Sequence, residues 1–439
     1  MTRLALLAAV AAAPLALAVA APAAAQSVAI TNAKLVIGDG SAPIDGGTVV
    51  VQNGRVIAAG KSVAVPAGVP TVDAGGRYVT PGIVAGFTRL GIVEVDAVDQ
   101  TNDSGARNSP FHASLDIAPA VNPLSSSIAL NRAEGITRAI VAPDTGGSIW
   151  AGLGAVIDLG ADRKAVSTPR AFQFMEYGET GARNAGGSRA AAILAFKDTL
   201  RQVREYAVKG GAWPDQGRDA LLTRADAVAL EPVVNGRMPL LIHVERASDM
   251  LVLIDIKKEM PQLRMVFVGA SEGWTIAQDI AAARIPVIAS ALNDLPASFE
   301  QLAATQSNVG RMKAAGVHVG IGTINDNDAR QARLEKQYAG NLVALNKVPG
   351  ATGLSWNDAF AAITSKTAEA IGLDNEIGSL KAGARGDVVI WDGDPLELGT
   401  ATVAVYVDGV KQPTETRQDA LAKRYLNPQE GALPKAYER

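Results

Sequence analysis

The sequence predicts an α/β protein in which β-rich chain ends flank a long region of alternating strands and helices. Tight-turn pairs such as Asn53-Gly54 and Asp408-Gly409 separate short apolar strands near both ends, which is a strong hairpin signal. Between them, apolar runs such as 240–244 and 264–268 alternate with helical patterns. This spacing favours parallel strands joined by crossover helices. We expect the two β-rich ends to form one small β-sandwich.

Residues 1–25 have the pattern of a secretory signal peptide. Arg3 is followed by a long run of Leu, Ala and Val that ends in small residues before Gln26. The run is long enough to span a membrane, but its high Ala content and its small-residue end favour a cleaved signal. We expect cleavage after Ala25, export to a bacterial periplasm and no membrane span in the mature chain.

Charge and cysteine content narrow the possible partners. Without Arg3, the mature chain keeps 40 of the 41 basic residues against 44 acidic ones, a net charge of −4. This balance argues against nucleic acid as a partner. The sequence contains no cysteine, which excludes disulfides, a thiol nucleophile and thiolate metal ligands. A small-molecule substrate or ligand is the expected partner.

The expected elements follow the chain in order. Two stretches are predicted as loops, a long polar one at 91–123 and a glycine-rich one at 146–154, and loops this long in a compact enzyme are usually functional. The predicted strands are 28–30, 35–37, 48–52, 55–58, 172–176, 240–244, 264–268, 286–290, 317–323, 387–391 and 403–407. The predicted helices are 188–209, 248–260, 274–283, 299–315, 328–345 and 356–371.

One stretch, 79–91, connects the N-terminal β unit to the α/β region. Its Pro81-Gly82 turn begins an apolar strand that runs through Phe87 to Arg89. The stretch resembles the barrel entry of the amidohydrolase superfamily, including its imidazolonepropionase-like members, where Pro-Gly leads into a strand ending in His-x-His. Segments 53–57 and 378–391 are also similar to that family.

The resemblance covers almost all of the mature chain and implies a fold. It implies a (β/α)8 TIM-like barrel plus a small β-sandwich domain formed by both chain ends. The implied divisions are the signal peptide (1–25), the two parts of the sandwich (26–80 and 376–415), the barrel (81–375) and a C-terminal tail (416–439).

The resemblance also implies a site for one or two divalent metals, most of whose ligand positions are substituted here. His243 keeps the ligand position of the fifth strand. The other positions hold Phe87 and Arg89 on the first strand, Glu176 or Glu179 near the fourth, Ala270 or Ser271 on the sixth and Ile324 on the eighth. A rescued zinc site from His243, His112 and a carboxylate such as Glu179 or Asp326 stays open.

Arg89 changes the expected electrostatics of this site. Phe87 and Arg89 are two residues apart on a strand, so their side chains point to the same side, the barrel interior. An arginine has no lone pair to offer a cation and repels it. It either forms an ion pair with a carboxylate such as Glu176, Glu179 or Glu245, or it holds a substrate carboxylate or carbonyl.

Two classes of function remain open. The first is an exported hydrolase of carbon–nitrogen bonds, in amides or cyclic amides, that works with a degenerate metal site. The second is an inactive family member that binds a small, possibly carboxylated ligand. The candidate catalytic residues are His243, Arg89 and Glu272, and the candidate substrate-binding residues are Arg89, His112, Trp150 and Arg246.

Weaker alternatives concern neighbours of these residues. A Ser271–His243 pair would be a serine nucleophile with its base. Glu245, Asp249 and Glu272 are possible acid–base groups, or simply carboxylates that stabilise helix starts. His318, at the start of the eighth strand, is expected to be structural.

Overall fold

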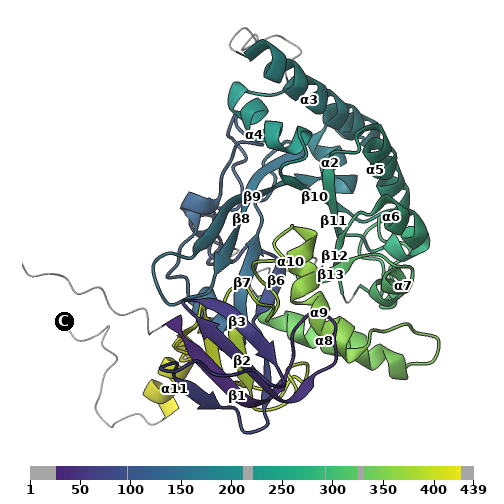
Figure 1. Ribbon diagram of the computed structural model, residues 1–439. Coiled ribbons are helices and arrows are strands. Elements are labelled where there is room, and N and C mark those ends of the chain that lie inside the picture. Colours follow the sequence, from purple (N-terminus) through teal and green to yellow (C-terminus); the bar gives the residue numbers. More distant parts are fainter. Residues whose placement is uncertain (1–25, 96, 211–220, 292, 325–330, 427–439) are drawn as a thin grey trace, which may run out of the picture.

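The computed structural model describes residues 26–95, 97–210, 221–291, 293–324 and 331–426. Figure 1 shows a barrel-like sheet with helices along its outside, and a smaller β unit below it that combines the two chain ends. The signal peptide expected at 1–25 lies outside the described residues. Within the described ranges, no helix is both long and apolar enough to cross a membrane.

Eight strands form the barrel sheet in the order β6 to β13. At the point where β6 meets β13, a Cβ on Gly86 would lie 2.2 Å from the carbonyl oxygen of Ile321, so glycine permits the close approach. The nearly closed barrel confirms the predicted fold class. Its strands are β6 (Ile83–Thr88), β7 (Ile136–Val141), β8 (Trp150–Asp158), β9 (Val166–Glu176), β10 (Pro239–Val244), β11 (Arg264–Gly269), β12 (Val287–Ser290) and β13 (Val319–Gly322).

Strand β8 corrects the sequence prediction of a loop at 146–154. It begins at Trp150 and runs antiparallel to both β7 and β9, so the strand direction is not uniform around the barrel. The glycines of this segment serve close packing within a strand. A Cβ on Gly154 would lie 2.1 Å from the ring of Phe172, and one on Gly152 would lie 2.5 Å from the carbonyl oxygen of Leu115.

Helices line the outside of the barrel. The predicted helix at 188–209 is confirmed, and the hydroxyl of Ser188 caps it by accepting the Ala191 amide. The predicted helix at 299–315 forms only from Asn308 onwards, and the one at 356–371 divides near Thr364. The helices are α1 (Ser126–Ala133), α2 (Gly178–Asn184), α3 (Arg189–Lys209), α4 (Arg224–Val234), α5 (Ala247–Glu259), α6 (Ala277–Ala283), α7 (Asn308–Ala314), α8 (Glu335–Ala344), α9 (Trp356–Ala362), α10 (Ser365–Ala370) and α11 (Arg417–Leu426).

The second sheet is mixed and takes strands from both chain ends, as predicted. Its order is β16-β15-β14-β5-β1-β2-β3, with β4 also paired to β1. The ends join where β5 pairs with β14, with Thr80 opposite Val389. Its strands are β1 (Val28–Leu35), β2 (Ile44–Gln52), β3 (Arg55–Gly60), β4 (Thr71–Asp73), β5 (Tyr78–Pro81), β14 (Val388–Trp391), β15 (Thr402–Val407) and β16 (Val410–Lys411).

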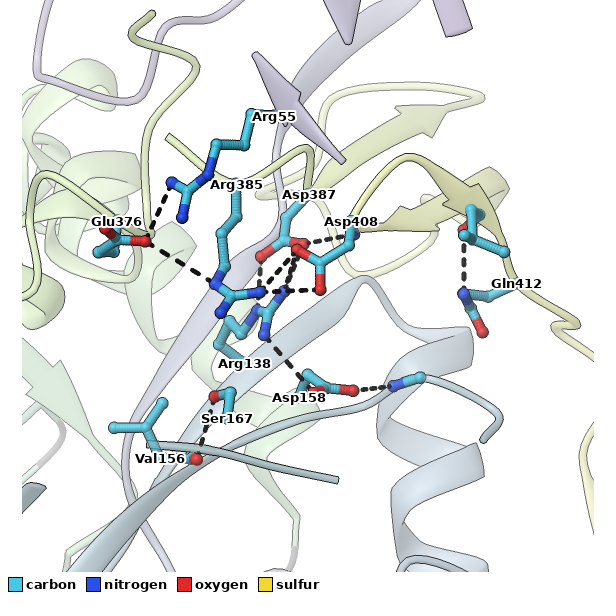
Figure 2. A network of polar contacts seen from close by, with 12 residues as sticks. Arg55, Arg138, Val156, Asp158, Ser167, Glu376, Arg385, Asp387, Asp408 and Gln412 are labelled. Atoms are coloured by element: carbon cyan, nitrogen blue, oxygen red, sulfur yellow. Dashed lines mark hydrogen bonds and ion pairs between the residues drawn. The ribbon is translucent and has the colours of Figure 1, made fainter. Parts of the chain in front are cut away.

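A buried arginine connects the barrel to this second sheet (Figure 2). Arg138 of β7 donates to both carboxylate oxygens of Asp387, at 2.7 and 2.9 Å, and to Asp408 at 2.9 Å. Asp158 lies 3.6 Å away, and Arg385 also donates to Asp408. Burial alone would lower the pKa of Arg138, but the carboxylates outweigh it and raise that pKa. The arginine therefore remains charged and holds the two sheets together.

Candidate functional site

His243 lies between two carboxylates at the carboxyl end of the barrel strands. Strand pairing places it directly opposite Glu176 of β9. Its Nδ1 is 2.7 Å from Glu176 Oε2, and its Nε2 is 3.1 Å from Glu245 Oε1. The strand ends of a barrel are where active sites of this fold form. The retained histidine is therefore part of a three-residue charged group.

The two carboxylates determine the protonation state of His243. Burial lowers the pKa of the imidazole, but hydrogen bonds and the charges of Glu176 and Glu245 raise it well above the ordinary value. The ring is therefore an imidazolium, with an N–H donated to each carboxylate. A protonated imidazole offers no lone pair to a metal, but it can donate a proton.

Glu245 is held in place by the turn after β11. Its Oε2 accepts the Ser271 amide at 2.8 Å, and its side chain is 2% exposed. Gly269, at φ +90°, makes room, since a Cβ there would lie 2.5 Å from Glu245 Oε1. Ser271 Oγ accepts instead from Asn293, at 2.8 Å. The structure thus places Glu245, not Ser271, against His243, and the serine–histidine pair is not formed.

Phe87 is in β6 and Arg89 directly follows it. Both lie at the carboxyl end of the barrel strands, like His243, and we call this end the barrel mouth. Phe87 packs against Phe174 inside the barrel, with ring centroids 5.2 Å apart, and the Arg89 guanidinium covers Phe87 at 5.0 Å. Arg89 donates to the carbonyl of Ala142 at 2.8 Å and lies 4.0 Å from Asp144 Oδ1. This near contact places Asp144 at the guanidinium, a carboxylate that the sequence analysis did not consider.

Burial lowers the pKa of Arg89, while the charges of Asp144 and Glu176 oppose that shift. Its side chain remains 15% exposed. A guanidinium has five N–H donors, and the contacts in the described ranges occupy only part of them. Arg89 is thus available to a carbonyl or carboxylate group entering the mouth.

The donor set does not fit the divalent metal that the family resemblance implies. Phe87 fills interior volume, Arg89 brings a positive charge, and His243 is protonated between carboxylates. Among the described residues, no group of three or more His, Asp or Glu side chains is arranged to hold a metal. Asp326, a weak candidate ligand, lies outside those residues.

Other candidates from the sequence lie apart from His243. Glu272 accepts the backbone amides of Ala247 and Ala303, at 2.9 and 3.1 Å, and so connects the start of α5 to the loop at Ala303. Arg246 directly precedes α5 and contacts Ser248. Glu179 lies 4.0 Å from Arg189. Within the described part of the chain, none of these hydrogen bonds or ion pairs reaches the imidazole.

His112 and Trp150 come together, but in a different place. Both line a cavity of about 280 Å³ between the first long loop and α3. Trp150 faces away from the barrel interior, packs against Phe196 at 5.8 Å and donates to Thr199. The structure therefore separates these two predicted substrate contacts from the charged group at His243.

Some site residues were missed by the sequence analysis. Asn293 connects Ser271, in the turn after β11, to Ser290 at the end of β12. Its side-chain carbonyl accepts the Ser290 hydroxyl at 3.2 Å. Asp144 follows soon after the end of β7. Both residues could have been found from the sequence, because each is a polar residue shortly after the end of a buried strand. Such positions lie at the carboxyl end of a barrel.

Comparison with known proteins finds similarity to amidohydrolases in part of the chain. A model of the amidohydrolase family matches residues 243–417. Amidohydrolase tasK of Hapsidospora irregularis is 23% identical over 403 residues, which are 83% of this chain and 40% of tasK. Imidazolonepropionase of Maricaulis maris is 34% identical over 106 residues, 24% of this chain and 25% of that enzyme. The chain thus aligns with less than half of each of these relatives.

The fold comparison agrees with the sequence matches. The crystal structure of an amidohydrolase from Thermotoga maritima superposes with a TM-score of 0.76 at 23% identity. The match covers 88% of this chain and 99% of that structure. The chain therefore has the fold of that amidohydrolase structure, and its residues 243–417 match the amidohydrolase family model.

Proposed function

We propose that the protein is an exported hydrolase that cleaves a carbon–nitrogen bond in a small carboxylated amide or cyclic amide. In this proposal, the charged side chains at the barrel mouth supply the chemistry. The observation that carries it is the His243 imidazolium held between Glu176 and Glu245, on the same mouth as Arg89. The names of the matched relatives support the bond type, since an amidohydrolase and an imidazolonepropionase are among them.

The roles follow from charge and exposure. Glu176, the less buried of the two carboxylates, removes a proton from water, and the hydroxide attacks the carbonyl carbon. Arg89 donates to the oxygen on which negative charge develops. His243 gives its proton to the leaving nitrogen as the carbon–nitrogen bond breaks. The proton on Glu176 then returns to His243, which restores the starting state.

The second candidate function is binding without turnover. It is favoured by one observation, which is that His243 donates to both carboxylates in the structure and each ring nitrogen already has a partner. Because every charge in this group already has a partner, the group can be a stable structural feature that takes part in no reaction. In this case Arg89 would anchor a ligand carboxylate, and no bond would be cleaved.

Turnover assays with chelator separate these possibilities. We expect cleavage of N-acyl amino acids or cyclic amides that persists after exhaustive chelation, and its loss in Glu176→Gln and His243→Asn. Arg170→Met is the matched control, because Arg170 is 66% exposed and forms a simple pair with Asp116. Binding without turnover, weakened by Arg89→Met, would favour the second function. Activity that disappears on chelation and returns with zinc would contradict the metal-free proposal.

A further inference from the structure

A second cavity lies at the opposite end of the barrel from His243. It encloses about 210 Å³ beside the start of β13, where helices α7, α9 and α10 meet. Its apolar walls are buried side chains, namely Val309, Val317, Val319 and Leu354. Active sites of barrel enzymes form at the carboxyl ends of the strands, so this cavity is distinct from the candidate active site.

Two lysines line the same cavity. Lys313 Nζ lies 2.9 Å from Asp358, and Lys366 Nζ lies 3.0 Å from Glu369. Their side chains are 41% and 31% exposed, so both ammonium groups remain accessible. An ammonium has three N–H donors, and one carboxylate does not use them all. The lysines can therefore donate to a ligand while they keep their ion pairs.

His318 adds a buried nitrogen to this wall. Its Nε2 lies 3.0 Å from Glu369 Oε2, but the two atoms are not aligned for a hydrogen bond. Within the described ranges, this buried nitrogen has no hydrogen-bond partner. Buried polar atoms are nearly always paired in folded proteins. The His318 ring forms part of the cavity wall and can therefore report on a ligand bound there, although this nitrogen itself is covered.

We propose that this cavity binds a small organic monocarboxylate with a compact apolar body. The valine and leucine walls would cover the body, and Lys313 and Lys366 would hold the carboxylate through charge-assisted hydrogen bonds. At about 30 Å³ per water molecule, the volume holds roughly seven waters. Bonded atoms pack more closely than separate waters, so a ligand of slightly more non-hydrogen atoms fits. Benzoate has that size and shape, and benzamide is its uncharged isostere.

Calorimetric titration of the full chain with benzoate tests this site. We expect benzoate to bind wild type, and to bind Lys313→Met and Lys366→Met about tenfold more weakly, a loss of about 1.4 kcal/mol. Lys197→Met is the matched control, because Lys197 is 43% exposed and also pairs with a single carboxylate, that of Glu259. It should leave benzoate affinity unchanged. Equal affinity for benzoate and benzamide would overturn the proposal.

Arg89 offers a competing place for an anion, so the titration is repeated with Arg89→Met. Unchanged benzoate affinity in that variant supports the cavity, whereas its loss would move the anion to the barrel mouth and refute the site. Proton NMR gives a readout in the wild-type protein, which has three histidines. We expect benzoate to shift the His318 ring signals, assigned with His318→Asn. Binding that leaves them unmoved would also refute the site.

Discussion

His243 and Glu176 stand directly opposite each other on neighbouring parallel strands, and their side chains meet at 2.7 Å. The contact depends on strand register, because neighbouring residues of a strand point to opposite faces. A shift of β9 by one residue would turn Glu176 away from the barrel interior. The acid–base group is therefore part of the barrel's own architecture.

The first prediction concerns the pH dependence of stability at His243. Its folded pKa is raised above the ordinary value of 6.5, so its stabilising contribution is fully present below pH 6.5. That contribution is lost as pH rises through the folded pKa. We expect the melting temperature of wild type to exceed that of His243→Asn most at low pH, with the difference shrinking on the alkaline side.

His318→Asn is the control for that series. Burial lowers the pKa of His318, so its neutral form is preferred in the fold. Its effect should run in the opposite direction, with stability lost as pH falls through the lowered pKa. Identical pH profiles for the two variants would show that His243 is not held as an imidazolium.

The second prediction concerns metal binding. The double variant Phe87→His/Arg89→His should place two metal-ligating histidines beside His243 and Glu176. It also removes the positive charge of Arg89, which repels a metal ion. We expect this double variant to retain zinc after gel filtration, measured by elemental analysis, and wild type to hold well under one metal per chain. Phe87→His alone should not gain zinc, because Arg89 remains. Stoichiometric zinc in wild type would contradict the donor-set argument.

The third prediction concerns Arg138, which joins the two sheets. Arg138→Met leaves Asp387 and Asp408 near each other without their cation. Breaking a buried ion pair in this way costs about 3–5 kcal/mol, measured by denaturant unfolding. The pair of Arg170 and Asp116 provides the comparison, because the Arg170 side chain is 66% exposed. Arg170→Met should cost about 1 kcal/mol or less. Equal effects would show that the buried network contributes little.

The fourth prediction concerns Asp158 in the same network. Burial raises its pKa from 3.8 to about 6, against the opposing effect of Arg138. Ionised Asp158 is therefore unfavourable above pH 6, and the penalty disappears as pH falls towards 3.8. Asp158→Asn should melt at a higher temperature than wild type above pH 6, and the gain should vanish near pH 4. The exposed Asp162, as Asp162→Asn, should show no such crossover.

The fifth prediction concerns export. The N-terminal pattern predicts a mature protein that begins at Gln26 and is released by osmotic shock. Intact-mass measurement of the released protein checks the cleavage position. Exported protein that retains Met1, or protein that stays with the membrane fraction, would count against the prediction.

The sequence predicted the second half of the barrel well, because its signals are local. The strands at 240–244 and 264–268 are short apolar runs, and both appear in the structure as expected. The first half was harder, since Gly152 and Gly154 were interpreted as loop residues. In the structure they let Leu115 and Phe172 pack directly against the backbone of β8. The sequence alone does not reveal these tertiary neighbours.

The site was predictable one residue at a time, but not as an arrangement. His243 and Arg89 were identified because the family resemblance marks their positions. The pairing of His243 with Glu176 and Glu245 depends on register and on the turn at Gly269. Trp150 was placed near the site because its segment was treated as a loop, whereas β8 turns its ring towards α3.

The pairing of β5 with β14 has a consequence for how the chain folds. Thr80 must find Val389, so the second sheet cannot be completed until almost the whole chain has been synthesised. Contacts between such distant residues slow folding, because a very long loop has to close first. A chain that folds late remains incompletely folded, and so able to pass through a narrow pore, for longer. The topology that joins the two ends is thus compatible with the predicted export, because an incompletely folded chain can pass through a secretion pore.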